Sequence, residues 1–584
     1  MTIADAPERQ LLDVNGDPIS SDEIAAIRVR AMGGGPRPND GFPFPFSQPD
    51  YQAGWFDTQE TNNWFPAFSS ADGSVLPNKD VSLARVRDVV RNDPSARAAV
   101  ERLVDLIVGP GLRFVSQPDA KTLGISAEEA QKLGREIETE FRLWGLEPRR
   151  YADAQRKTLI HGLTRLFARS MIMGGEATYQ FDWRPDYGAR YSTCVLAIDP
   201  DRLSNPYYKI DTLTLRGGVE MDTAGAAIAY HVREAHAGDW WAYGKAWTWA
   251  RVPRETAWGR PVFVHAFEPE REGQTRAITP FASLIVHLRM IGKFGQTELA
   301  SATANALFAA FVESSLPVDE VTKALDPRAH TYADRIVNFY HRFPPRVGGV
   351  RIPVLLPGTT IGMNSKPRQT TAFPAFETAF LQKIASALGL SYEQLAMDWS
   401  RTNYSSARAA LNEVWRTIRR QSAVFIEQVM LPMLYAVIEE AFDKGYIRRP
   451  RSSAAGIGHN GGPAPDFWDM PGAYLKGRWI GPGRGYIDPV KEAEAGALRM
   501  ESMTSTLEIE CAEQGLDWEE VLDQIAAEEQ ALKARGLTRL SLVAAVQSAR
   551  GPKPDSLEAQ GPAGPDGVAS GREASQSDAS QAEE

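Results

Sequence analysis

Three carboxylates come nearest, by residue type and spacing, to forming a reactive site. Asp199 and Asp201 follow a strand-like segment and lie two residues apart, and Glu176 stands at the start of another such segment. Three carboxylates could hold a divalent metal ion that activates water for phosphodiester cleavage, as in metal-dependent nucleases. The same aspartates also suit a turn in which their side chains accept backbone N–H groups. We favour the turn, because the histidine or lysine partners that a nuclease would use are missing.

The other patterns associated with catalysis are weak or missing. The segment GIGHNG at 456–461 matches the dinucleotide-binding fingerprint, but it neither follows a strand nor opens a helix, so a flexible loop is the better interpretation. The sequence contains no GxxxxGK[ST] phosphate loop, no GxSxG elbow and no HExxH zinc motif. The eight histidines are scattered, which favours structural roles over metal binding. We therefore expect no enzymatic activity and no cofactor.

Composition and charge exclude several classes of protein. A chain of 584 residues, 43% hydrophobic and 24% charged, indicates a soluble protein with several domains or one extended subunit. The net charge of −10 argues against a protein that coats nucleic acid. Two cysteines provide no disulfide framework and fit a reducing compartment. We find no apolar run of membrane-spanning length and no signal peptide, so we expect an intracellular protein without a membrane partner.

The longest predicted helix runs from about Tyr404 to Lys444. Asn403 can accept a hydrogen bond from a free N–H group of the first turn, and Gly445 suits the left-handed C-terminal position. Pro432 should kink the helix, since proline removes one backbone hydrogen bond. One helical face carries apolar residues at intervals of four and seven: Val414, Ile418, Phe425, Val429 and Met433.

The charges of this helix run against its dipole. Basic residues gather in its first half and acidic residues at its end: Arg408, Arg416, Arg419, Arg420, Glu439, Glu440 and Asp443. One interpretation is a solvated face without a specific role. The alternative is that identical helices of neighbouring chains pair with each other.

The remaining pattern predicts an α+β fold. Two helices broken at Asn92-Asp93-Pro94, and further helices over 126–145 and 150–173, precede strand-like segments such as TYQFDW and CVLAIDP. Short strands follow between 215 and 268, where five tryptophans lie between 240 and 258. Base stacking is possible for these rings, but we favour sheet packing. Helices are also predicted from 279 to about 313, from 488 and over 517–535.

Several ordered blocks of the sequence resemble the lambda-type portal proteins of tailed phages. The blocks extend over roughly residues 80–540 and include Asp199, Asp201 and the stretch Arg271–Arg276, in which Glu272 stands where the family has proline. The residues of the C-terminal half that carry the resemblance are Asn403, Tyr404, Ser405, Ser406, Arg408, Trp415, Pro432, Trp479, Asp488, Pro489, Lys491 and Glu492.

The resemblance implies a division of the chain into the parts of a portal subunit. These parts are residues 1–78 as an N-terminal arm, 79–403 as a wing domain of helices and antiparallel β-structure, 404–445 as a stem helix, 446–487 as a small clip containing β-structure, 488–511 as a second stem helix, 512–550 as a helical crown region and 551–584 as an acidic tail. The composition of the tail, rich in Pro, Gly and Ser, predicts disorder.

The resemblance also implies a function and partners. A homo-oligomeric ring, dodecameric by the family pattern, would sit at one capsid vertex of the virion and pass double-stranded DNA during packaging and ejection. Its implied partners are the terminase large subunit, the major capsid or scaffold protein and the head–tail connector, with assembly in the host cytoplasm. Basic residues of the clip are candidates for contact with DNA or the motor, although solvated loop charge explains them equally well: Arg448, Arg449, Arg451, Arg478 and Arg484. A minor head or scaffold protein that forms no ring is the second rival, beside the nuclease.

Overall fold

The computed structural model describes residues 65–308, 346–347, 350–351, 372–400, 402–451, 464–484 and 489–537. The chain divides into two compact units, residues 1–515 and 516–584, which are described separately. The acidic tail, Asp488 and all of the N-terminal arm before residue 65 lie outside the described residues.

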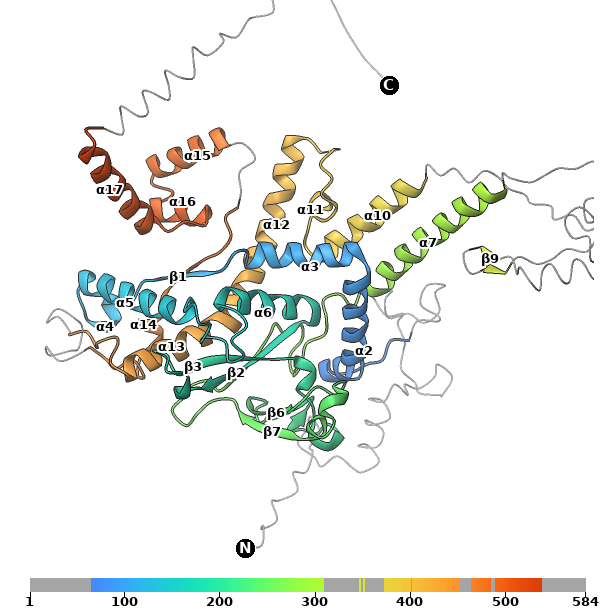
Figure 1. The fold of residues 1–584 in the computed structure, drawn as a ribbon, viewed down its shortest axis with the longest axis horizontal. Coiled ribbons are helices and arrows are strands. Elements are labelled where there is room, and N and C mark those ends of the chain that lie inside the picture. Colours follow the sequence, from blue (N-terminus) through green and yellow to red (C-terminus); the bar gives the residue numbers. More distant parts are fainter. Residues whose placement is uncertain are drawn as a thin grey trace, which may run out of the picture. The chain divides into compact units, whose positions relative to one another are not determined.

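The first unit combines helices with small antiparallel sheets (Figure 1). Its helices are α2 (Ala71–Asn92), α3 (Pro94–Ile107), α4 (Ala120–Leu123), α5 (Ala127–Gly145), α6 (Ile160–Gly174), α7 (Ile285–Phe308), α10 (Ala372–Ala387), α11 (Tyr392–Ala396), α12 (Tyr404–Phe425), α13 (Leu431–Asp443), α14 (Pro471–Tyr474), α15 (Pro489–Glu501) and α16 (Leu507–Glu513). Its strands are β1 (Arg113–Ser116), β2 (Glu176–Trp183), β3 (Thr193–Ile198), β4 (Leu215–Arg216), β5 (Val219–Met221), β6 (Ala227–Arg233), β7 (Trp249–Pro253), β8 (Phe263–Phe267), β9 (Arg346–Val347), β10 (Val350–Arg351) and β11 (Gly477–Ile480).

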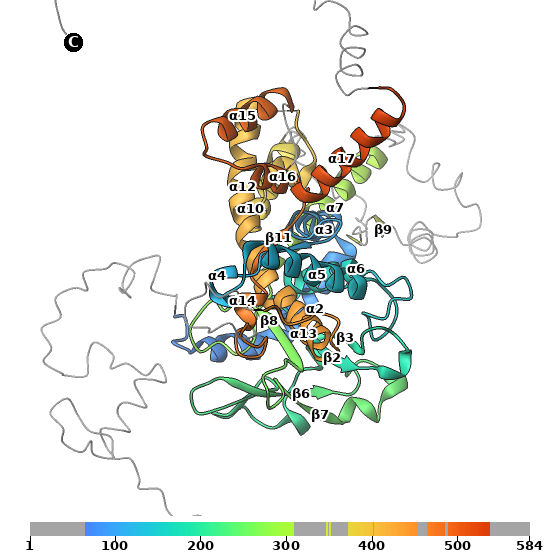
Figure 2. The ribbon, with the colours of Figure 1, turned by 90° about the vertical axis from the view of Figure 1, so that its left-hand side faces the viewer.

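Two sheets and a layer of helices form the main body of this unit. The strands pair antiparallel in the orders β3-β2-β8 and β4-β5-β6-β7. In both ribbon views the sheet of β2 and β3 lies between helix α6 and the sheet that contains β6 and β7 (Figures 1 and 2). A large apolar core joins α3, α5, α6, β2 and α13, and a smaller one fills the space under β5, β6 and β7. The predicted α+β class is confirmed.

Local capping explains where the first helices begin and end. The Asp93 carboxylate accepts the N–H of Ala96 at 2.9 Å and so caps α3, whose first residue is Pro94. This confirms the predicted break. Helix α2, however, already starts at Ala71, because Ser70 caps it by accepting the N–H of Gly73 at 3.0 Å. The predicted boundary at residue 78 therefore falls inside a helix.

The predicted long helix forms, but its middle is not α-helical. The Asn403 side chain accepts the N–H of Ser406 at 2.9 Å, as expected for the cap of α12. Between α12 and α13 the segment Ile426–Met430 is a π-helix, in which the N–H of Leu431 donates to the carbonyl of Ile426. This wider turn ends two residues before Pro432, which has no N–H to offer the preceding turn. The helix changes direction between α12 and α13 (Figure 1), and Gly445 follows with a left-handed φ of 70°.

The second half of this helix belongs to the core of its own chain. Met433, Leu434, Val437 and Ile438 are fully buried. By length and composition Ser406–Asp443 is the one helix among the described residues that could cross a membrane, although we expected no such segment. Burial of α13 in the core explains its apolar composition. It also removes α13 from the surface that a free stem helix would offer, so the expected stem at 404–445 differs from the structure in its second half.

Several charges of the same helix have partners elsewhere in the chain. Arg420 pairs with Glu268 at 2.7 Å, and Arg419 pairs with Glu513 at 3.1 Å. Near the other end, Glu440 accepts the backbone N–H groups of Ser192 and Thr193 at 2.6 and 2.9 Å. These contacts account for Arg419, Arg420 and Glu440 without a second helix from a neighbour.

The segments expected to form the clip, 446–487, and the second stem helix, 488–511, also have a different structure from the one predicted. In the described part of 446–487, strand β11 pairs with β1, placing Trp479 opposite Phe114, and Phe467 and Tyr474 are buried in the main core. This part therefore packs on the main body of the first unit rather than forming a separate module. The expected helix over 488–511 is two helices, because Thr506 caps a new helix by accepting the N–H of Ile509.

The second unit contains helix α17 (Trp518–Ala534), which confirms the predicted helix over 517–535. The Asp517 carboxylate caps it by accepting the N–H of Glu519 at 2.9 Å.

Replacement of Tyr179 by phenylalanine tests the attachment of the π turn to the sheet. The fully buried Tyr179 hydroxyl donates to the carbonyl of Val429 at 2.7 Å. Loss of this donor in Tyr179→Phe should lower the free energy of unfolding by about 1–3 kcal/mol, measured by urea denaturation. The matched control is Tyr446→Phe, whose hydroxyl donates to the carbonyl of Arg190 at 3.0 Å in an exposed position and should cost much less. Equal losses in the two variants would contradict the assignment.

Candidate functional site

A sharp turn from helix to strand carries the carboxylate of Glu176 into the protein interior. Helix α6 ends at Gly174, and Gly175 adopts a left-handed φ of 83° before β2 begins at Glu176. A side chain at Gly175 would collide with the carbonyl of Ile278, so the close approach of these two segments requires glycine.

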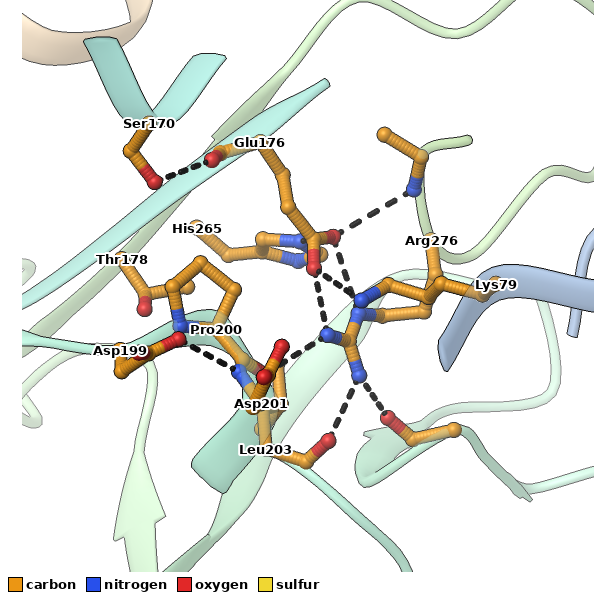
Figure 3. Close-up of polar contacts among 12 residues, drawn as sticks. Lys79, Ser170, Glu176, Thr178, Asp199, Pro200, Asp201, Leu203, His265 and Arg276 are labelled. Carbon is orange, nitrogen blue, oxygen red and sulfur yellow. Dashed lines mark hydrogen bonds and ion pairs between the residues drawn. The ribbon is translucent and has the colours of Figure 1, made fainter. Parts of the chain in front are cut away.

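Glu176 is the centre of a buried charge cluster (Figure 3). Its carboxylate receives the Arg276 guanidinium at 2.5 and 3.0 Å, the Lys79 ammonium at 2.9 Å and the Nε2 of His265 at 2.9 Å. The exposed fraction of these four side chains is 5% or less. Two cations therefore share one carboxylate in a region without solvent.

Arg276 also binds the backbone of three other segments. Its guanidinium donates to the carbonyls of Leu203, Gly217 and Pro200 at 2.7, 2.6 and 3.0 Å. A guanidinium has five N–H donors in a fixed plane, so one side chain can hold several chain segments in a defined arrangement. The cluster thus connects α2, β2, β8, the turns near residues 200 and 217, and the segment that leads to α7.

The charges of the cluster set its protonation states. Burial by itself raises the pKa of Glu176, but the charges of Arg276 and Lys79 outweigh it and hold that pKa well below the ordinary value. Burial lowers the pKa of His265, whose Nε2–H then donates to Glu176 as a neutral imidazole. Every strong charge already has a partner, so this is a structural cluster rather than a site for a substrate.

The structure does not bring the three proposed nuclease carboxylates together. Glu176 is held by the cluster, whereas the Asp199 carboxylate accepts the N–H of Asp201 at 3.1 Å (Figure 3). Arg87 donates to Asp199 at 2.8 Å and to Asp201 at 2.5 Å. This confirms the turn and contradicts the three-carboxylate metal site.

The two aspartates do form a possible metal-ligand group with a histidine instead of Glu176. Ligand atoms of Asp199, Asp201 and His236 lie within 4.8 Å of one another, the one such group found among the described residues. The Arg87 guanidinium, however, already pairs with both carboxylates. Its positive charge neutralises the groups that would have to bind a metal cation. We therefore assign these residues to the structure of the turn.

Three of the five predicted clip arginines make contacts within the chain. Arg449 pairs with Asp466 at 3.4 Å, and Arg478 pairs with Glu508 at 3.5 Å. The Arg484 guanidinium donates to the side chain of Asn412. Arg448 and Arg451 are exposed. These contacts do not test the expected role of the five arginines in binding DNA or the motor, which stays a prediction.

The residues that carry the family resemblance have structural positions where they are described. Asn403 caps α12, whose first residues are Tyr404, Ser405 and Ser406, and Pro432 follows the π turn. Trp415 and Trp479 line one cavity. Another cavity is lined by Arg408, Pro489 and Glu492. Lys491 lies exposed on α15.

The tryptophan-rich region is not packed as expected. Trp240, Trp241, Tyr243 and Trp258 are all more than 60% exposed, so the predicted sheet packing is wrong for these rings. They lie on short turns beside the four-stranded sheet rather than on its strands. The sequence shows that aromatic residues are dense here, but it does not show that their rings are exposed to solvent.

Comparison with known proteins identifies the family. The profile described as phage portal protein, lambda family, matches residues 57–421. The chain belongs to this family of portal proteins of tailed phages.

Individual relatives cover most of the chain. The portal protein of Escherichia phage N15 is 31% identical over 510 residues, which is 86% of this chain and 94% of the relative. Portal protein B of Escherichia phage lambda is 30% identical, over 82% of this chain and 89% of the relative. Among solved structures, a chain from the neck of the native gene transfer agent particle, computed with C12 symmetry, aligns at a TM-score of 0.30 and 12% identity, over 74% of this chain and 96% of that chain. A TM-score this low supports no further conclusion.

Replacement of Glu176 by glutamine tests the role of the buried cluster. Glu176→Gln keeps the shape of the side chain but leaves Arg276 and Lys79 without a buried counter-charge, so we expect a loss of about 3–5 kcal/mol in the free energy of unfolding. The control is Asp199→Asn, in a more exposed pair with Arg87, where we expect about 1 kcal/mol or less. Urea denaturation followed by circular dichroism measures both. A loss in Glu176→Gln no larger than in the control would exclude a dominant role for the cluster.

The same carboxylate predicts a pH dependence. Because its pKa is lowered in the folded state, Glu176 contributes stability that is complete above its unfolded pKa of about 4.5 and is lost as the pH falls towards the folded value. The thermal midpoint of the wild type should therefore decrease below about pH 4.5, and its advantage over Glu176→Gln should narrow in the same range. A constant difference between the two proteins from pH 7 to pH 3 would contradict this assignment.

Proposed function

We propose that this chain is the subunit of a ring, dodecameric by the family pattern, at one capsid vertex. Double-stranded DNA would be packaged and ejected through the ring, which would dock the terminase large subunit and the head–tail connector and contact the major capsid or scaffold protein. The ring would assemble in the host cytoplasm and remain in the virion. Membership in the portal family is the observation that carries this proposal.

A pair of helices is the best candidate for contact between neighbouring subunits. Helices α7 and α10 pack against each other through Phe294 and Phe376, whose ring centroids are 4.7 Å apart. Of the α7 residues from Ile285 to Ser301, Leu288 is the one buried side chain. Val286 and Leu299 remain more than 60% exposed.

Such a helix needs further apolar cover. A long helix that exposes large apolar side chains along its length is stabilised by another molecule on that surface. Identical subunits around an axis supply this cover by heterologous contacts. We therefore propose α7 and α10 as the stem, in place of 404–445 and 488–511, because α13 is buried in its own core and the second segment is two helices.

The proposed function requires no catalytic residue. The one metal-ligand trio of the described residues is bridged by Arg87, and the net charge of −10 disfavours tight binding of DNA. A protein through which DNA slides benefits from weak attraction, since each neutralised phosphate strengthens binding and would slow translocation. The purified chain should therefore leave plasmid DNA intact with Mg²⁺ or Mn²⁺.

Electron microscopy of the chain, alone and with capsid and scaffold proteins, tests the ring. We expect class averages with fixed rotational symmetry and an open centre. Leu299→Glu should shift most particles to monomers, because a charge would be buried between subunits. Ile210→Glu is the control, since Ile210 is 88% exposed on another segment, and it should leave rings intact. A wild-type chain that stays monomeric under every one of these conditions would overturn the ring, and rings of Leu299→Glu would overturn the stem assignment alone.

A further inference from the structure

Five aromatic side chains form a continuous surface beside the four-stranded sheet. We call this surface the aromatic patch and define it as Tyr207, Tyr208, Tyr243, Trp247 and Trp249. Neighbouring rings contact each other at centroid distances between 5.2 and 6.4 Å. Tyr207, Tyr208 and Tyr243 are 73%, 61% and 68% exposed. So many exposed rings in contact mark an interaction surface, because tyrosine and tryptophan dominate the energetics of protein interfaces.

Two tyrosines of the patch, Tyr207 and Tyr208, have an unfavourable backbone conformation. Tyr207 and Tyr208 both have left-handed φ values, 53° and 55°, which cost energy in residues with a Cβ atom. Asn205 supports this turn, since its amide donates to the carbonyl of Lys209 at 2.9 Å and its Oδ1 accepts the N–H of Gly218 at 2.7 Å. The fold thus maintains a strained turn whose result is two outward-facing tyrosines.

The N-terminal arm contains a segment of complementary chemistry. Residues 36–49 read PRPNDGFPFPFSQP, in which prolines alternate with phenylalanines at 42–46. Proline-rich segments bind grooves lined by aromatic rings, because they lose little conformational entropy and offer flat apolar faces. The phenylalanines add aromatic pairs of the kind that already joins the rings of the patch.

The arm joins the described chain next to the same sheet. The carbonyl of Ser69 accepts from Arg271 at 3.3 Å, and Asp72 pairs at 2.9 Å with Arg216 of strand β4. About twenty residues separate Phe46 from Phe65, enough for roughly 60 Å of extended chain. The segment can therefore reach the patch of its own copy or of a neighbouring one.

We propose that residues 36–49 dock on the aromatic patch, with Phe44 and Phe46 against Tyr208 and Tyr243. Duplex DNA is a poorer occupant, because its bases are stacked inside the helix and offer the rings no free face. The arm would then fasten the N-terminus to the wing, within one copy or across two.

Photo-crosslinking in the full-length chain tests this docking. The photoreactive residue p-benzoylphenylalanine replaces Phe44, and mass spectrometry maps the products with the assembled protein. We expect crosslinks to peptides that contain residues 205–216 or 236–249. The double variant Tyr208→Ala, Tyr243→Ala should reduce the crosslink yield about tenfold, which corresponds to a loss of about 1.4 kcal/mol in docking free energy. Leu213→Ala is the matched control, since Leu213 is 90% exposed five residues after Tyr208 in the sequence but carries no ring, and it should leave the yield unchanged. Circular dichroism verifies that each variant is folded.

A second variant changes the arm alone and leaves every described residue intact. Phe44→Ala with Phe46→Ala should increase quenching of tryptophan fluorescence by acrylamide, because Trp247 loses its cover. Unchanged quenching would overturn the proposal. So would crosslinks from position 44 to other parts of the chain, to DNA or to another virion protein, the absence of any crosslink, or a yield that survives the double tyrosine variant.

Discussion

The ion cluster around Glu176 is the constraint on which the sheets and helices around it depend. A carboxylate removed from water is stable only with charged and hydrogen-bonding partners of good geometry, and those partners come from α2, β8 and the segment before α7. Arg276 extends the same network to three backbone carbonyls. Because these groups must be satisfied together, the segments that carry them cannot shift independently.

A second set of buried acids fixes the long helix in the same way. Glu439 receives Arg260 and the indole N–H of Trp258, and Glu440 receives two backbone N–H groups of the β3 region. Together with the π turn before Pro432, these contacts make α13 part of the sheet's support. Helix α12, which precedes the π turn, has a more exposed, basic surface. The two halves of one helix therefore have different physical roles.

The surfaces that the chain leaves uncovered indicate where other molecules contribute. Helix α7 exposes apolar side chains along its length, and the aromatic patch exposes tyrosines on a strained turn. In both places the described residues leave apolar surface exposed, which is costly unless another segment or another subunit covers it. A portal subunit works within an assembly, so surfaces of this kind are consistent with the family to which the chain belongs.

The sequence by itself determined the local features and the family. Capping by Asp93 and Asn403, the stop at Gly445, the turn at Asp199 and the α+β class depend on residues close together in the chain, and the family is carried by ordered short motifs. Only the tertiary structure decided that Glu176 belongs to Arg276 and Lys79, that α13 is core, that β11 pairs with β1 and that the tryptophans near 240 face solvent. These outcomes depend on contacts between residues up to hundreds of positions apart. An apolar or charged residue gives the same pattern in the sequence whether it packs in the core of its own chain or against another molecule.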